Sequence, residues 1–191
     1  MRKTIILSIV IVMFSVTNIF AGDFFMAKQS FGGKMVLGWD HMEKNWLTEM
    51  VTDSEGSFFT IGVGPMFDIG PVSFNAPLSF SLTKTGLSDE LDLAPRFDIN
   101  AGKFLIQNWY DIIFTTEYFD SWTTDNRVLY KTGVHKVGIN VLTSSEDDFH
   151  IATVGALDQY KITSVFTICT FLGVSSDNET VAWLKAKFFL P

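Results

Sequence analysis

The amino-acid sequence predicts an all-β protein, an antiparallel up-and-down meander closed into a β-barrel of about 8–10 strands. The main observation is the segment 57–84, in which apolar and small polar residues alternate around a turn at Gly70-Pro71. A second segment, 91–116, repeats this alternation around a turn at Ala101-Gly102. Because side chains alternate across a strand, each segment is expected to fold as a hairpin with one apolar face. Two hairpins in succession make a meander.

The first residues are expected to be a secretory signal outside the fold. Arg2 and Lys3 precede an apolar run from Thr4 to Val16, and a cleavage site follows at Ala21. An apolar run of this length is short for a spanning helix and typical of a signal peptide. We therefore expect a signal peptide over residues 1–21 and a single β-barrel domain over residues 22–191. An uncleaved anchor is the alternative.

The register of the first hairpin follows from its turn. With Gly70-Pro71 in the turn, Ile69 lies opposite Val72 and Val63 lies opposite Leu78. Glycine suits the first turn position because it takes positive φ without steric cost. The residues expected on the apolar faces of the two hairpins are Phe59, Ile61, Val63, Val72, Phe74, Leu78, Phe80, Phe97, Ile106 and Ile112. The opposite face is small and polar.

The length of this hairpin indicates a membrane. The strand from Val72 to Leu82 extends about 36 Å at roughly 3.3 Å per residue. Tilted by about 40°, it rises about 28 Å, which is enough to cross the roughly 25 Å apolar band of an outer-membrane barrel. The alternative is a soluble exported β-barrel whose apolar face is internal and binds an apolar ligand. The two interpretations differ in which face is outward.

The rest of the chain supplies further strands. They are expected over residues 34–41, 45–51, 127–143, 149–157, 162–174 and 180–190, with residues 22–31 ambiguous and 85–90 and 117–126 as loops. In 127–143 the apolar face changes parity, which predicts a β-bulge near Gly133–Lys136. Pro65 and Pro77 fall inside strands and should interrupt the hydrogen-bond ladder at one level.

The best-supported polar cluster is the inner face of the second hairpin. The predicted turn places Asp92 opposite Asp111 and Arg96 opposite Gln107. The candidates for a lumen or constriction are Asp92, Arg96, Asp98, Gln107, Asp111, Arg127, Lys131, Lys136 and Lys185. Two interpretations stay open. The cluster is either a plug of salt bridges that stabilises a narrow barrel or a constriction that selects solutes by charge.

The chain resembles small porin-like outer-membrane β-barrels of Gram-negative bacteria. It shares with them an export signal, an amphipathic meander and an apolar, aromatic last strand. This chain differs from that group at its end. Such proteins usually finish on an aromatic residue, whereas here Leu190 and Pro191 follow Phe189. The resemblance implies the cell outer membrane and a narrow passive channel for small polar solutes. It also implies contact with the bilayer and outer-membrane lipids, and assembly by the barrel-assembly machinery. A structural or interaction barrel with a plugged lumen is the second candidate.

Composition and spacing argue against other functions. A net charge of −7 with dispersed basic residues argues against nucleic acid as a partner, and a single cysteine excludes an internal disulfide. No cofactor or metal-ligand spacing is evident, so no cofactor is predicted. We do not expect an enzyme. Acyl-transfer or lipase chemistry at the membrane rim, with His41 and Ser121 as its candidates, is a minor alternative because Ser121 lies outside any G-x-S-x-G turn.

Overall fold

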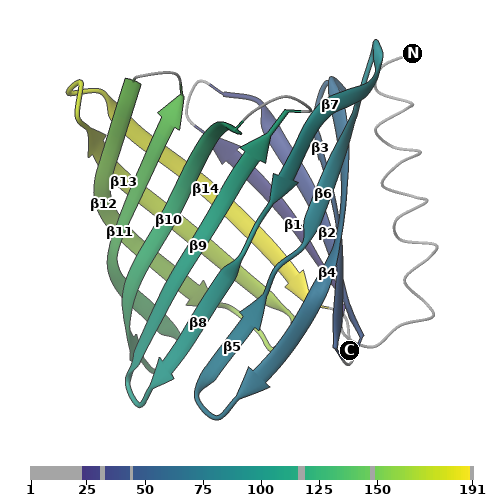
Figure 1. Ribbon diagram of the computed structural model, residues 1–191. Helices are drawn as coiled ribbons and strands as arrows, with labels where there is room; N and C mark the ends of the chain where they lie inside the picture. The colour runs from purple at the N-terminus through teal and green to yellow at the C-terminus, as the bar shows by residue number, and fades with distance from the viewer. Residues whose placement is uncertain (1–22, 31–32, 44, 116–118, 147–148, 190–191) are drawn as a thin grey trace.

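The computed structural model describes residues 23–30, 33–43, 45–115, 119–146 and 149–189, and these residues form antiparallel strands without helices (Figure 1). The predicted signal peptide lies outside the described residues. The strands are β1 (Asp23–Ser30), β2 (Met35–Glu43), β3 (Trp46–Asp53), β4 (Phe58–Ile69), β5 (Val72–Asn75), β6 (Leu78–Thr83), β7 (Gly86–Leu93), β8 (Arg96–Ala101), β9 (Phe104–Phe114), β10 (Phe119–Thr132), β11 (His135–Glu146), β12 (Phe149–Lys161), β13 (Phe166–Ser175) and β14 (Thr180–Phe189). Among these residues no helix is long and apolar enough to cross a membrane.

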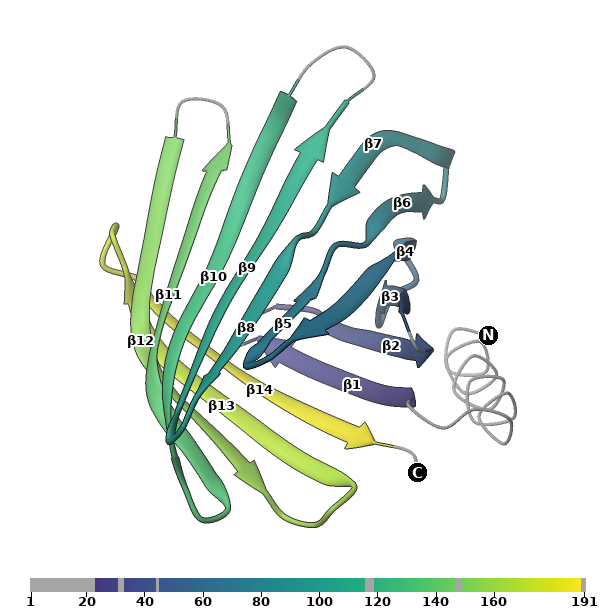
Figure 2. The same cartoon turned by 60° about the horizontal axis from the view of Figure 1, so that its bottom comes forward.

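The sheet closes on itself as an up-and-down barrel (Figures 1 and 2). β10 pairs with both β9 and β11, and β1 pairs with β14, so neither end of the meander leaves an unpaired edge. β5 and β6 both pair with β4 and are two halves of one wall strand, as are β7 and β8. The described wall therefore has 12 strands, more than the predicted count, and the fold class is confirmed.

The first hairpin has the predicted register. Ile69 pairs with Val72 and Val63 pairs with Leu78, and Gly70 adopts a φ of 57° in the turn. The apolar face of this hairpin points away from the barrel interior, as the exposed fractions of 45% for Val63 and 46% for Leu78 show. The large apolar side chains of this wall therefore form an outer surface.

The second hairpin turns one residue later than predicted. The turn is Gly102-Lys103, so Ala101 pairs with Phe104 and Asp92 pairs with Ile113 instead of Asp111. Gly102 has a φ of 59°, a conformation that alanine avoids, which explains why the turn starts at the glycine. Because the partner shifts by two positions, every side chain keeps its predicted face.

The parity change in residues 127–143 is a turn, so the prediction of a bulge was wrong. Thr132 pairs with His135 around Gly133, which has a φ of 58°. The segment thus divides between β10 and β11. β10 begins at Phe119 and β7 at Gly86, so both stretches expected to be loops are largely strand. These differences, together with β1, account for the larger strand count.

Prolines interrupt two neighbouring wall strands at one level. Pro77 separates β5 from β6 and Pro95 separates β7 from β8, whereas β4 continues unbroken through Pro65. The ladder between β4 and its neighbour stops at the pair Val63–Leu78 and resumes at Met66–Asn75, so the predicted interruption at the level of Pro65 and Pro77 is confirmed. The backbone N–H of Ala94 donates to the Pro77 carbonyl at 2.9 Å, so the wall stays closed across the break.

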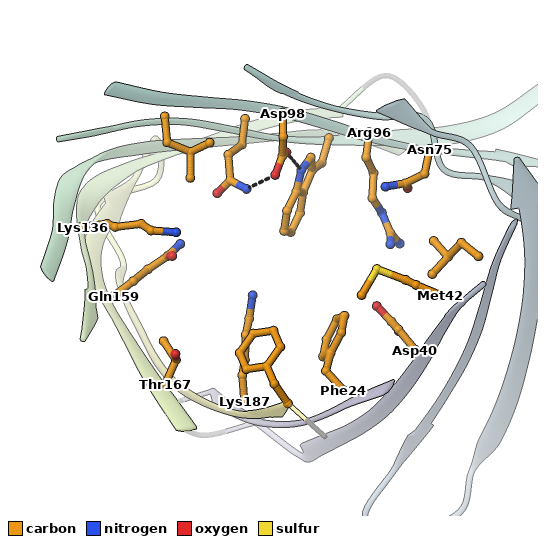
Figure 3. Close-up of a pocket in the computed structure, with 15 residues that line it drawn as sticks. Phe24, Asp40, Met42, Asn75, Arg96, Asp98, Lys136, Gln159, Thr167 and Lys187 are labelled. Atoms are coloured by element: carbon orange, nitrogen blue, oxygen red, sulfur yellow. Dashed lines mark hydrogen bonds between the residues drawn. The ribbon is translucent and has the colours of Figure 1, made fainter. Parts of the chain in front are cut away.

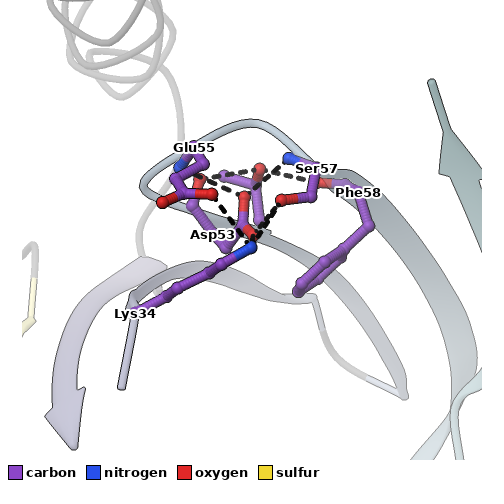
Figure 4. A network of polar contacts seen from close by, with 6 residues as sticks. Lys34, Asp53, Glu55, Ser57 and Phe58 are labelled. Atoms are coloured by element: carbon purple, nitrogen blue, oxygen red, sulfur yellow. Dashed lines mark hydrogen bonds and ion pairs between the residues drawn. The ribbon is translucent and has the colours of Figure 1, made fainter. Parts of the chain in front are cut away.

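The turn between β3 and β4 is fixed by the carboxylate of Asp53 (Figure 4). Its Oδ1 accepts the backbone N–H of Ser57 at 2.7 Å and of Glu55 at 3.2 Å. The Lys34 ammonium, from the connection before β2, lies 3.4 Å from Asp53 and 3.0 Å from Glu55. The hydrogen bond to Glu55 raises the pKa of Lys34 above its usual value. These contacts tie two neighbouring connections together at this end of the barrel.

The barrel interior combines an apolar cluster with a polar remainder. The buried cluster lines the wall from β9 to β14 and consists of Leu105, Leu129, Leu157, Cys169, Phe171 and Trp183. Gly173 makes room for it, since a Cβ at this position would lie 2.6 Å from Cζ of Phe171. The connections that the structure describes in full contain two to four residues, too few to fold deep into the interior. Side chains of the wall therefore determine the shape of the lumen.

Candidate functional site

The lumen contains a cavity of about 280 Å³ toward the end of the barrel where β14 ends. Asp40, Arg96, Asp98, Lys136 and Lys187 line it from four different wall strands (Figure 3). Strands far apart in the sequence contribute these charges because barrel closure places β2, β8, β11 and β14 around one axis. The cavity is large enough for several water molecules, each of which occupies about 30 Å³ in the liquid.

Glu49 links three wall strands across the lumen side of β4. Its carboxylate lies 2.9 Å from the Arg96 guanidinium on β8 and accepts a hydrogen bond of 3.2 Å from the Ser79 hydroxyl on β6. Gly62 on β4 permits this reach, because a Cβ there would lie 2.8 Å from Cγ of Glu49. The small residues of β4 thus provide the groove in which the Glu49 side chain lies.

Trp109 organises the polar wall of β8, β9 and β10. Its indole Nε1 donates to Asp98 at 2.8 Å, and Gln107 donates to the other oxygen of the same carboxylate at 2.7 Å. The Arg127 guanidinium lies over the Trp109 ring at 4.2 Å and pairs with the carboxylate of Asp125. The acidic groups on this wall are therefore largely engaged by donors of the protein itself.

Four lysines line the side of the lumen opposite the Trp109 wall, and their surroundings differ from those of the carboxylates there. Lys28 extends from β1, Lys136 from β11, and Lys185 and Lys187 from β14. In the part of the chain that the structure describes, none of their ammonium groups lies within 4.0 Å of a carboxylate. Lys28 and Lys185 instead lie 5.1 and 6.0 Å from the centre of the Trp183 ring. The lumen thus has a lysine wall, formed by these four residues, facing an acidic wall.

The predicted lumen residues occupy different places inside the barrel. Arg96, Asp98, Gln107 and Lys136 line the cavity. Arg127 is buried beside Trp109, and Lys185, which is partly exposed, lies beside Trp183. Asp92 and Asp111 share the inner face but are diagonal neighbours, and Asp111 accepts a hydrogen bond from Thr123. Lys131 binds Asn100 and the Gly102 carbonyl near the turn, away from the centre. Their role in solute selection remains a prediction.

Sequence reasoning missed several charged residues of the lumen. They are Lys28, Asp40, Glu49 and Asp125. The signal for Asp40 was present, since Met35, Leu37 and Trp39 alternate on the other face of the same strand. Lys28 was missed because residues 22–31 showed no clear alternation, and Asp125 because it fell in a predicted loop.

The residues predicted to face lipid all lie on the outer side of the wall. Phe74 pairs with Phe97, and Ile106 pairs with Val128, which is 52% exposed. The same alternation places the remaining seven outside, namely Phe59, Ile61, Val63, Val72, Leu78, Phe80 and Ile112. The large apolar residues here are outward, which argues against a soluble barrel with an apolar interior.

The two residues considered for rim chemistry do not meet. His41 lies near the end of β2, where its Nδ1 is 2.5 Å from Oδ1 of Asp23. Ser121 lies near the start of β10, at the other end of the barrel, and pairs with Glu146 and Ile113. The described residues contain no group of three His, Cys, Asp or Glu side chains that could hold a metal ion. The geometry therefore offers no nucleophile–base pair at these positions.

Comparison with known proteins identifies the architecture. No family model matches the sequence, and no curated protein matches it. Among solved structures, the KdgM porin superimposes with a TM-score of 0.67 at 12% identity, covering 88% of this chain and 99% of its own. The NanC porin gives 0.61 at 12% identity, covering 88% of this chain and 100% of its own. This chain has a porin-like β-barrel fold.

A second structure of the KdgM porin, described as a complex with disordered oligogalacturonate, gives a TM-score of 0.66 at 13% identity. It covers 88% of this chain and 99% of its own. The proteins compared here are thus porins of about the same length as this barrel. At these identities the likeness concerns the fold.

Proposed function

We propose that the protein is an outer-membrane channel, narrow and passive, for small polar solutes. The observation that carries the proposal is the separation of the two faces of one wall. Large apolar side chains point outward, whereas charged groups of both signs surround the inner cavity. An apolar exterior suits lipid and a charged interior suits water and solutes. The porin-like fold supports the same function, and assembly by the barrel-assembly machinery belongs to this proposal.

The lysine wall gives this channel a preference for anions. Lys28, Lys136, Lys185 and Lys187 have no carboxylate within 4.0 Å among the described residues, so an anionic solute would supply the counter-charge that these ammonium groups lack. Among the acidic groups opposite, Glu49 pairs with Arg96 and Asp125 pairs with Arg127, and Asp98 accepts hydrogen bonds from Gln107 and Trp109. The KdgM porin, which forms a complex with disordered oligogalacturonate, offers a parallel with an anionic solute.

Ion selectivity in planar bilayers tests this function. We expect the wild-type protein to conduct and to show a reversal potential that favours anions under a salt gradient. The double variant Lys185→Gln/Lys187→Gln should shift the reversal potential toward cation preference while leaving the barrel folded. Lys84→Gln, a change in the exposed turn between β6 and β7, is the matched control and should leave selectivity unchanged. A wild-type protein that never conducts in planar bilayers would refute the proposed channel function.

A structural or interaction barrel with a plugged lumen is the second candidate. The observation that favours it is the buried cluster of Leu129, Leu157, Phe171 and Trp183, which fills one side of the interior. Under this alternative, the lysine substitutions should not change conductance, because there is none to change. Fractionation with outer membranes and heat-modifiable migration in detergent are expected for both candidates. Recovery as a soluble protein would contradict both.

A further inference from the structure

Two opposite charges line the lumen cavity without pairing with each other. Asp40 on β2 and Lys187 on β14 extend into the cavity from the same side, and Phe24 lies between them (Figure 3). Within the part of the chain that the structure describes, neither group forms a hydrogen bond or an ion pair within 4.0 Å. The space between the carboxylate and the ammonium is therefore open to a solute.

Phe24 on β1 separates the two charges. It pairs with Asp40 across the β1–β2 ladder, and the Lys187 Nζ lies 5.9 Å from the centre of its ring. Since β14, β1 and β2 are neighbours, two strand spacings of about 4.8 Å set the two charged residues about 10 Å apart along the wall. Phe189, whose ring lies 5.6 Å from that of Phe24, and Met42 extend the apolar part. We call Asp40, Phe24 and Lys187 the dipolar site.

The other charged groups of the cavity have different surroundings. Arg96 pairs with Glu49 at 2.9 Å, and Asp98 accepts hydrogen bonds from an amide and an indole of neighbouring residues. Lys136, from β11, lies farther round the cavity wall (Figure 3). The dipolar site is thus the place where an acid and a base stand close together on one wall and both lack a counter-charge from the described residues.

The chemistry of the dipolar site selects among solutes. A charge that is partly removed from water is costly unless an opposite charge compensates it. An inorganic anion or a carboxylic acid would compensate Lys187 and leave Asp40 alone, whereas a simple amine would do the reverse. A neutral sugar would compensate neither. A solute that carries an ammonium and a carboxylate compensates both, and the Phe24 ring and the Met42 thioether suit an apolar body on the same solute.

We propose that the dipolar site binds zwitterionic amino acids with apolar side chains. The solute ammonium donates to the Asp40 carboxylate, the solute carboxylate accepts from the Lys187 ammonium, and the side chain packs against Phe24 and Met42. This inference rests on the proposed channel function and names a solute class for it. It adds Asp40 and Phe24 to the residues that determine which solutes enter.

Block of the potassium chloride current in planar bilayers at neutral pH tests the site with three probes. Leucine carries both charges, isocaproate is leucine without the ammonium, and isoamylamine is leucine without the carboxylate. We expect leucine to halve the current at a concentration about tenfold below that of either analogue, because each analogue loses one charge-assisted hydrogen bond. Asp40→Asn should make leucine as weak as isocaproate, and Lys187→Gln should make it as weak as isoamylamine.

Two control variants carry the same changes at exposed positions of the β6–β7 hairpin. Lys84→Gln and Asp89→Asn should keep the wild-type order of the three probes. Equal block of the wild-type protein by leucine and isocaproate, or leucine block that survives both site substitutions, would overturn the inference. Glycine that blocks as well as leucine would overturn the role of Phe24 and Met42.

A second measurement does not depend on conduction. If the wild-type protein never conducts, the proposed channel function fails, and saturation-transfer NMR on the detergent-folded protein decides the inference instead. Saturation transfer to leucine that is present in the wild type and lost in Asp40→Asn would support the dipolar site. Absence of transfer to leucine in the wild type, or transfer that persists in Asp40→Asn, would overturn it.

Discussion

Placing a positive charge on the outer face should destabilise the barrel far more than placing it one residue away on the inner face. Phe74→Arg makes the outward change and Ser73→Arg makes the inward one on the same strand, β5. Phe74 lies about 10 Å along the strand from the turn, hence about 8 Å into the band. Arginine costs about 2–4 kcal/mol at the midplane and less toward the rim, so about 2 kcal/mol applies here.

Loss of aromatic contacts adds to this cost. The Phe74 ring lies 4.8 Å from the Phe67 ring and 4.8 Å from the Phe97 ring, centre to centre. Each such pair contributes about 0.5–1.5 kcal/mol, which brings the expected loss for Phe74→Arg to about 3–5 kcal/mol. Phe74→Leu removes only the aromatic part and should cost about 1–3 kcal/mol.

The inner-face control should be nearly neutral. Ser73 pairs with Asp68 and Asp98 in the two neighbouring strands, so an arginine at this position finds acidic partners. We expect Ser73→Arg to change stability by less than about 1 kcal/mol. The assay is denaturant unfolding in lipid vesicles followed by tryptophan fluorescence, with heat-modifiable migration as a check of folding. If Phe74→Arg and Ser73→Arg had equal effects, the assignment of faces to lipid and lumen would be wrong.

Two further predictions concern charged groups. Glu49→Gln should lower the free energy of unfolding by about 3–5 kcal/mol, because it leaves the Arg96 guanidinium inside the barrel without its carboxylate. Glu55→Gln at the exposed turn should cost less than about 1 kcal/mol in the same assay. The Ser175 hydroxyl lowers the pKa of Asp177 below its usual value, so this contact stabilises the folded state at neutral pH and is lost as the pH falls through the folded-state pKa. The difference in unfolding midpoint between wild type and Asp177→Asn should therefore shrink in acid, and a difference that persists there would contradict this assignment.

The sequence by itself determined the fold class and the face of most side chains. Strict alternation assigned outer and inner faces in both central hairpins, and it did so even where the turn was displaced to Gly102. The reason is that a shift of two positions preserves the period of the strand, so facing depends on parity and not on the partner. The register of the first hairpin was also predictable, because Gly70 is the residue there that takes positive φ without strain.

The tertiary structure alone decided which charged groups meet. Glu49 reaches Arg96 across β4 because Gly62 has no side chain, and no local pattern announces a contact between residues so far apart in the sequence. The lysine wall likewise arises because closure brings β1 beside β14. Alternation is a local property of one strand, whereas the pairing of lumen charges depends on the number of strands and their closure around a common axis.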